Sequence, residues 1–110
     1  MKSALLAVVV GLATVLSAHA EFAKSATFTV AGYNGSSELT NMPVLVRLNQ
    51  DMTVDCRADG KDLQFTSEDG AAVYPHEIDV WNRSGESLVW VKLPILKKGV
   101  QFKLNYGDAD

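Results

Sequence analysis

The chain has 110 residues, with 13 acidic and 10 basic side chains and a formal net charge of −3 at pH 7. This acidic balance argues against nucleic acid and anionic membrane surfaces as partners. The length is enough for one small domain with one core, and the single cysteine, Cys56, cannot form a disulfide within the chain.

The first 20 residues have the pattern of a cleavable secretory signal peptide. Lys2 gives a positive start, residues 4–16 are apolar and uncharged, and Ala18 and Ala20 are the small residues that precede a cleavage site. The apolar run is shorter than the roughly 20 residues that cross a membrane as a helix. We therefore expect cleavage after Ala20 and export to the periplasm or the extracellular space. The mature domain, residues 21–110, is not expected to span a membrane.

The rest of the chain shows the alternating apolar and polar pattern of β-strands, and no segment has a convincing helical pattern. In chain order, the expected strands are residues 27–33, 44–48, 62–66, 77–81, 88–93 and 100–106. Turn-forming residues separate them, for example Asn34-Gly35 and Asp69-Gly70.

Short strands with turns at this spacing predict an all-β fold. A single sheet would leave either Leu88 and Trp90 or the residues between them uncovered, so two packed sheets are favoured over one. We predict a small antiparallel β-sandwich, with a jelly roll among the strand arrangements that fit and a small barrel as the alternative. Trp90 and Cys56 are expected to be buried side chains.

Glu77, Asp79 and Trp81 are the candidate ligand-binding residues. They occupy alternate positions of one expected strand, so they are predicted to share a face at a spacing of about 7 Å. Two carboxylates and an indole in a row can hydrogen-bond sugar hydroxyls and stack on a pyranose ring. The alternative is two solvent-facing acids and a tryptophan that covers a sheet edge. Paired carboxylates at this spacing also suit glycoside hydrolysis, which is the most distant interpretation.

A second group of acidic residues lies in the expected turns, at Asp55, Asp59, Asp62, Glu68 and Asp69. Oxygen ligands of this kind bind calcium, but the spacing is not that of an EF-hand, and turn geometry explains the Asp-Gly pairs. We predict no metal site and no cofactor. His76 is expected to have a structural or surface role.

Five blocks of the chain resemble, in the same order, a bacterial family known only as domain of unknown function 2341. They are residues 41–48, 58–66, 75–82, 85–94 and 105–108, which begin with Asn-Met-Pro-Val and end with Asn-Tyr-Gly-Asp. The resemblance implies an exported β-sandwich module of larger envelope or secreted proteins. Such modules occur beside concanavalin A-like or laminin G-like domains, and sometimes with proton-channel proteins of the MotA/TolQ/ExbB type. It implies no established activity. The full gene product is expected to continue into a lectin-like or membrane domain.

These features favour a non-catalytic exported binding or adhesion module, with a glycan or an envelope protein as the candidate partner. The alternative is a structural or sensory periplasmic domain of a larger envelope or proton-channel protein. A glycan-active enzyme ranks last, because the sequence contains no nucleophile motif, metal cluster or phosphate-binding loop.

Overall fold

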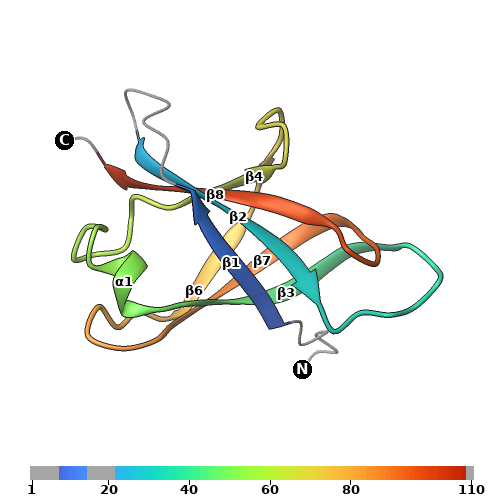
Figure 1. Ribbon diagram of the computed structural model, residues 1–110, viewed down its shortest axis with the longest axis horizontal. Coiled ribbons are helices and arrows are strands. Elements are labelled where there is room, and N and C mark those ends of the chain that lie inside the picture. Colours follow the sequence, from blue (N-terminus) through green and yellow to red (C-terminus); the bar gives the residue numbers. More distant parts are fainter. Residues whose placement is uncertain (1–7, 15–21, 109–110) are drawn as a thin grey trace.

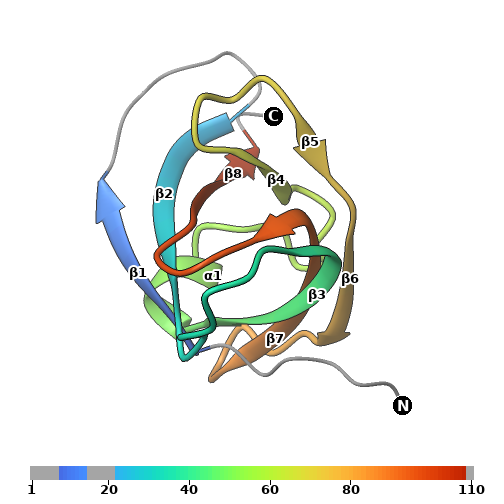
Figure 2. The ribbon, with the colours of Figure 1, turned by 90° about the vertical axis from the view of Figure 1, so that its right-hand side faces the viewer.

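The computed structural model describes residues 8–14 and 22–108, which form two antiparallel sheets packed face to face (Figures 1 and 2). The first sheet has the strand order β1-β2-β8-β4-β5, and the second has the order β3-β7-β6. In chain order the elements are β1 (Val8–Thr14), β2 (Phe22–Ala31), β3 (Leu39–Leu48), α1 (Gln50–Thr53), β4 (Gln64–Ser67), β5 (Val73–Tyr74), β6 (His76–Val80), β7 (Ser87–Leu96) and β8 (Gln101–Asp108). The prediction of an all-β sandwich is confirmed.

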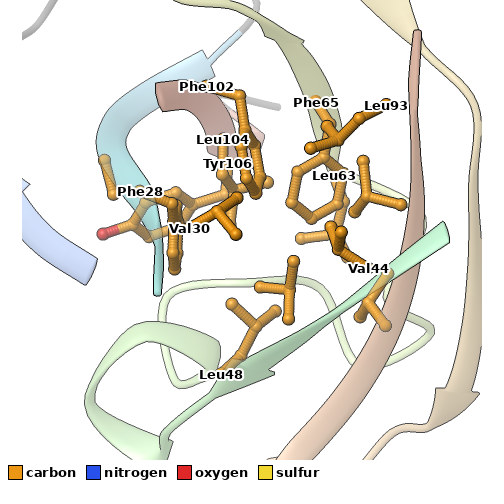
Figure 3. Packing of buried hydrophobic residues seen from close by; sticks show 14 of the residues in the cluster. Phe28, Val30, Val44, Leu48, Leu63, Phe65, Leu93, Phe102, Leu104 and Tyr106 are labelled. Atoms are coloured by element: carbon orange, nitrogen blue, oxygen red, sulfur yellow. The ribbon is translucent and has the colours of Figure 1, made fainter. Parts of the chain in front are cut away.

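Alternating apolar residues on the facing sides of the two sheets form one core (Figure 3). Phe102 of β8 lies near its centre, with its ring stacked 5.8 Å from that of Phe28 and tilted 6.1 Å from that of Phe65. All three rings are at most 1% exposed. Aromatic pairs of this geometry contribute about 0.5–1.5 kcal/mol beyond the burial of their surface. The three rings therefore link β2, β8 and β4, which are neighbours in the first sheet, in addition to the backbone hydrogen bonds between these strands.

Every predicted strand overlaps an observed one, although the boundaries differ. β3 starts at Leu39, several residues earlier than predicted, and its pairing with β7 keeps one register from Leu39 opposite Leu96, through Pro43, to Leu48 opposite Ser87. Asn41 has a φ of 53°, in the left-handed region that asparagine tolerates better than most residues. The short helix α1 was not predicted, since four residues are too few to show a helical period. The side chain of Asn49 caps it by accepting a hydrogen bond of 3.1 Å from the backbone N–H of Met52.

The chain passes directly from the first sheet to the second at Pro75. This residue alone separates β5 from β6, and its carbonyl accepts a hydrogen bond of 3.0 Å from the backbone N–H of Lys92 on β7. One side of the sandwich is thus closed by a continuous segment of chain, as Figure 2 shows. On the opposite side, β1 pairs with β2 and also contacts β3.

β1 falls inside the segment predicted to be a signal peptide. The rest of that segment, residues 1–7 and 15–20, lies outside the described residues, so the signal peptide and its cleavage stay a prediction. Within residues 8–14 and 22–108, no helix is long and apolar enough to cross a membrane.

Candidate functional site

A bulge in β6 decides which of the predicted site residues share a face. Ile78 pairs with Val89 of β7, and the next pair joins Val80 to Leu88, so Asp79 is an extra residue on the β6 side. An extra residue of this kind shifts the alternation of the strand by one position. Val80 consequently takes the place on the outer face that regular alternation would give to Asp79, and it is 42% exposed.

Trp81 follows the bulge and does not join Glu77 and Asp79 in a row. Its indole Nε1 donates a hydrogen bond of 3.0 Å to the carbonyl of Ala58, and its ring lies against Gly60 at the margin of the core. The side chain is half-buried in this position. Trp81 therefore holds the 58–60 turn against the second sheet, while Glu77 and Asp79 remain exposed.

Trp90 lies on the outer face of the second sheet, so the expectation that it packs in the core is wrong. Its neighbours Val89 and Val91 are both 0% exposed and face the first sheet, whereas adjacent residues of a strand point to opposite faces. Trp90 sits directly between Leu45 of β3 and Glu77 of β6. The second tryptophan, rather than Trp81, is thus the indole next to Glu77.

The outer face around Trp90 carries a hollow of about 340 Å³. We call it the Trp90 hollow. It is lined by Asn41, Pro43, Pro75, His76, Glu77, Trp90 and Lys92, which come from β3, the β5–β6 junction, β6 and β7. Its volume lies near the lower end of the range for small-molecule sites, about 300–1,000 Å³. One large aromatic side chain with a few polar groups around it is the usual composition of such a site.

The charged groups of the Trp90 hollow are available to a ligand. Glu77 and Lys92 are exposed, and among the ion pairs and hydrogen bonds of residues 22–108 neither side chain has a partner. A carboxylate only accepts hydrogen bonds and an ammonium only donates them, so the two groups are complementary toward a polyhydroxylated molecule. The amide of Asn41 both donates and accepts at the same hollow.

His76 joins the Trp90 hollow to the core. Its ring packs on Phe65 with a centroid distance of 5.3 Å and a tilt of 60°, while another side of the residue is open to solvent. This partial burial lowers the pKa of His76 below its ordinary value, because a charged imidazolium would lose hydration against the phenyl ring. The neutral imidazole offers one donor and one acceptor.

Three of the acidic residues of the turns, Asp59, Asp62 and Asp69, are engaged in local structure. Asp59 and Asp69 each accept a hydrogen bond of 3.0 Å from the backbone N–H two residues later, which is the geometry of an Asx-turn. Asp62 accepts two bonds from the backbone N–H of Arg57. In the part of the chain that the structure describes, no three His, Cys, Asp or Glu side chains are grouped to hold a metal ion. Turn geometry therefore accounts for Asp59 and Asp69.

Cys56 is a core residue, as expected. It is 5% exposed and belongs to the hydrophobic cluster. Burial is the main reason that the pKa of its thiol rises to about 12, with the nearby Asp62 adding to the effect. The thiol is therefore protonated at neutral pH and is a poor nucleophile.

The fold and the hollow define a small antiparallel β-sandwich with an aromatic site open to solvent on its three-stranded sheet. Comparisons of the chain with protein-family models, with curated proteins and with solved structures found no match. The resemblance to domain of unknown function 2341 accordingly stays a prediction.

Proposed function

We propose that this chain is an exported, non-catalytic binding module that holds a carbohydrate in the Trp90 hollow. One observation carries the proposal: a half-exposed indole lies in a hollow with the carboxylate of Glu77 and the ammonium of Lys92, neither of which has a partner among the described residues. The proposal keeps Glu77 from the predicted site and replaces Trp81 with Trp90.

A sugar ring matches these groups chemically. One face of a pyranose presents C–H groups that pack on an indole, and its equatorial hydroxyls both donate and accept hydrogen bonds. Glu77 can accept from a hydroxyl, Lys92 can donate to one, and Asn41 can do either. Pro43 and Pro75 add rigid apolar surface to the same hollow without bringing further charge.

The residues that line the Trp90 hollow support a non-catalytic role. Glycoside hydrolysis uses a pair of carboxyl groups on either side of the scissile bond. Of the described residues that line the Trp90 hollow, Glu77 alone carries a carboxyl group.

Export is supported by the leader pattern of the first 20 residues. N-terminal sequencing of the protein recovered from the periplasm or the medium tests it directly. We expect the recovered protein to begin at Glu21. A protein that retains Met1 and stays in the cytoplasm would contradict export without bearing on the hollow.

Binding is tested by glycan-array screening, followed by calorimetric titration of any glycan that binds. We expect Trp90→Ala to weaken binding at least tenfold, which corresponds to about 1.4 kcal/mol. Leu88→Ala is the matched control, since Leu88 lies on the same face of β7 but does not line the hollow. A bound glycan whose affinity is unchanged by Trp90→Ala would refute the site, and failure to bind any glycan would refute the ligand class.

The role of the charge on Glu77 is tested by two isosteric replacements on β6. Glu77→Gln removes a charge that lines the hollow, whereas Asp79→Asn removes one from the bulge next to it. We expect the first to weaken glycan binding several-fold and the second to leave it unchanged. Equal effects would show that the net charge of the surface, and not the hollow, governs binding.

A further inference from the structure

One edge of β2 is covered by β1, a strand that lies within the predicted signal peptide. β1 pairs with β2 antiparallel over seven positions, from Val8 opposite Ala31 to Thr14 opposite Ser25. The other edge of β2 pairs with β8. β1 is thus an edge strand of the first sheet, and it also contacts β3, the edge strand of the second sheet (Figure 1).

Cleavage after Ala20 would remove β1 together with the rest of the leader, a step that rests on the export in the proposed function. β2 would then become the edge strand of the first sheet. An uncovered edge presents a row of unpaired backbone N–H and C=O groups, on which another strand can pair.

The groups that face this edge belong to the odd-numbered residues of β2. The backbone N–H of Val30 donates a bond of 2.9 Å to the carbonyl of Val100, on the β8 side. Because backbone groups alternate between the two edges of a strand, Thr27 and Thr29 direct theirs toward β1, as do their odd-numbered neighbours in β2.

We propose that the vacated edge of β2 pairs with the same strand of a second copy, which makes the processed protein a dimer with one sheet continuous across its two-fold axis. A two-fold axis between identical edge strands gives antiparallel pairing. With the axis at Phe28, Thr27 lies opposite the partner's Thr29, and both direct their backbone groups across the interface. Ser25 then lies opposite the partner's Ala31.

The side chains of β2 suit this register on both faces. Ala26, Phe28 and Val30 are at most 4% exposed and face the core, and about Phe28 they would align with the partner's core-facing residues. The segment 25–31 carries no charge, and Lys24, the single charged residue of β2, falls outside it. Edge strands that stay unpaired usually carry charges or proline along the paired stretch. The strand that occupies this edge in the structure, β1, is uncharged as well.

Cysteine cross-linking tests the register. Residues opposite each other in a hydrogen-bonded pair have Cα atoms about 5.5 Å apart, within the roughly 4.4–6.8 Å that a disulfide spans. We expect the double variant Thr27→Cys/Thr29→Cys to form a covalent dimer on oxidation of the processed protein. The matched control is Gln101→Cys/Lys103→Cys, which has the same spacing on the directly paired positions of β8, in the middle of the sheet. We expect no covalent dimer from the control.

Sedimentation equilibrium tests the uncovering of the edge. We expect the processed protein to have twice the monomer mass. Ala20→Arg blocks cleavage, and the chain that keeps its leader is expected to be monomeric. Thr27→Pro, which removes an N–H from the open edge and spares the bonds to β8, should return the processed protein to a monomer. Should this variant fail to fold, the cysteine pair still decides the register.

Three results would overturn the proposal. A processed protein that stays monomeric at every concentration refutes the dimer but leaves export intact. Equal cross-linking of the β2 and β8 cysteine pairs refutes the register. If only the unprocessed chain is recovered, both the uncovering of β2 and the export on which it rests are refuted.

Discussion

Replacement of Gly60 by alanine should destabilise the protein more than the same replacement at Gly70. Both glycines end a turn in which their N–H donates to the carbonyl three residues earlier, at 3.0 and 2.9 Å, and their φ values are +71° and +79°. A Cβ atom at Gly60 would lie 2.9 Å from two atoms of the Trp81 ring. A Cβ atom at Gly70 would have no atom within 4 Å.

The two replacements share one cost and differ in another. Left-handed backbone costs an alanine about 1–2 kcal/mol at either site. At Gly60, the forced displacement of Trp81 adds the usual cost of overpacking, about 1–3 kcal/mol. The displacement also strains the bond from the indole to Ala58, which is worth about 1 kcal/mol. We therefore expect Gly60→Ala to lose about 1–3 kcal/mol more than Gly70→Ala.

Urea unfolding followed by far-ultraviolet circular dichroism measures this difference. A difference of 1 kcal/mol corresponds to about 4–8 °C in melting temperature for a domain of this size. In a Trp81→Leu background the excess cost of Gly60→Ala should shrink, because the ring it meets is gone. Equal losses at Gly60 and Gly70, with or without Trp81, would refute the structural role assigned to this tryptophan.

Three further predictions concern Cys56, His76 and Phe102. Cys56 should resist a thiol reagent at pH 8 in the folded protein and react once urea unfolds it; prompt labelling of the folded protein would contradict its burial. The lowered pKa of His76 means that the unfolded chain binds this proton more readily, so its contribution to stability is complete above about pH 6.5 and declines as the pH falls below that value. His76→Gln should flatten this part of the profile when urea unfolding is compared at pH 7 and pH 5, and an unaltered profile would argue against His76 as its source. Phe102→Ala should cost about 3–5 kcal/mol by the same measurement, against less than about 0.5 kcal/mol for Lys103→Ala on the opposite face of β8; similar losses would argue against a core centred on Phe102.

Alternation along the strands was sufficient to predict the sandwich. In β8 the alternate apolar residues Phe102, Leu104 and Tyr106 face the core, and all three are at most 3% exposed. The strand order could not be predicted, because pairing between β2 and β8 joins opposite ends of the domain and leaves no local pattern.

The candidate site was predicted only in part, for two different reasons. The bulge at Asp79 inserts a residue without changing the apolar pattern of β6, so counting alternate positions placed Trp81 on the wrong face. The position of Trp90 could have been predicted, because Lys92 shares its face and marks that face as exposed. The hollow itself depends on Asn41 and Pro75, which meet β7 only through the tertiary fold.

The position of β8 in the first sheet also determines when that sheet can be completed. β8 lies between β2 and β4 and is the last described strand to leave the ribosome. β8 is the central strand of the first sheet, so this sheet cannot be completed before β8 has been synthesised. Long-range pairing of this kind is slow to form. The strands of the second sheet, by contrast, all precede β8 in the chain. The strand order therefore makes the completion of the common core wait for the last strand of the chain that the structure describes, which brings Phe102 between Phe28 and Phe65.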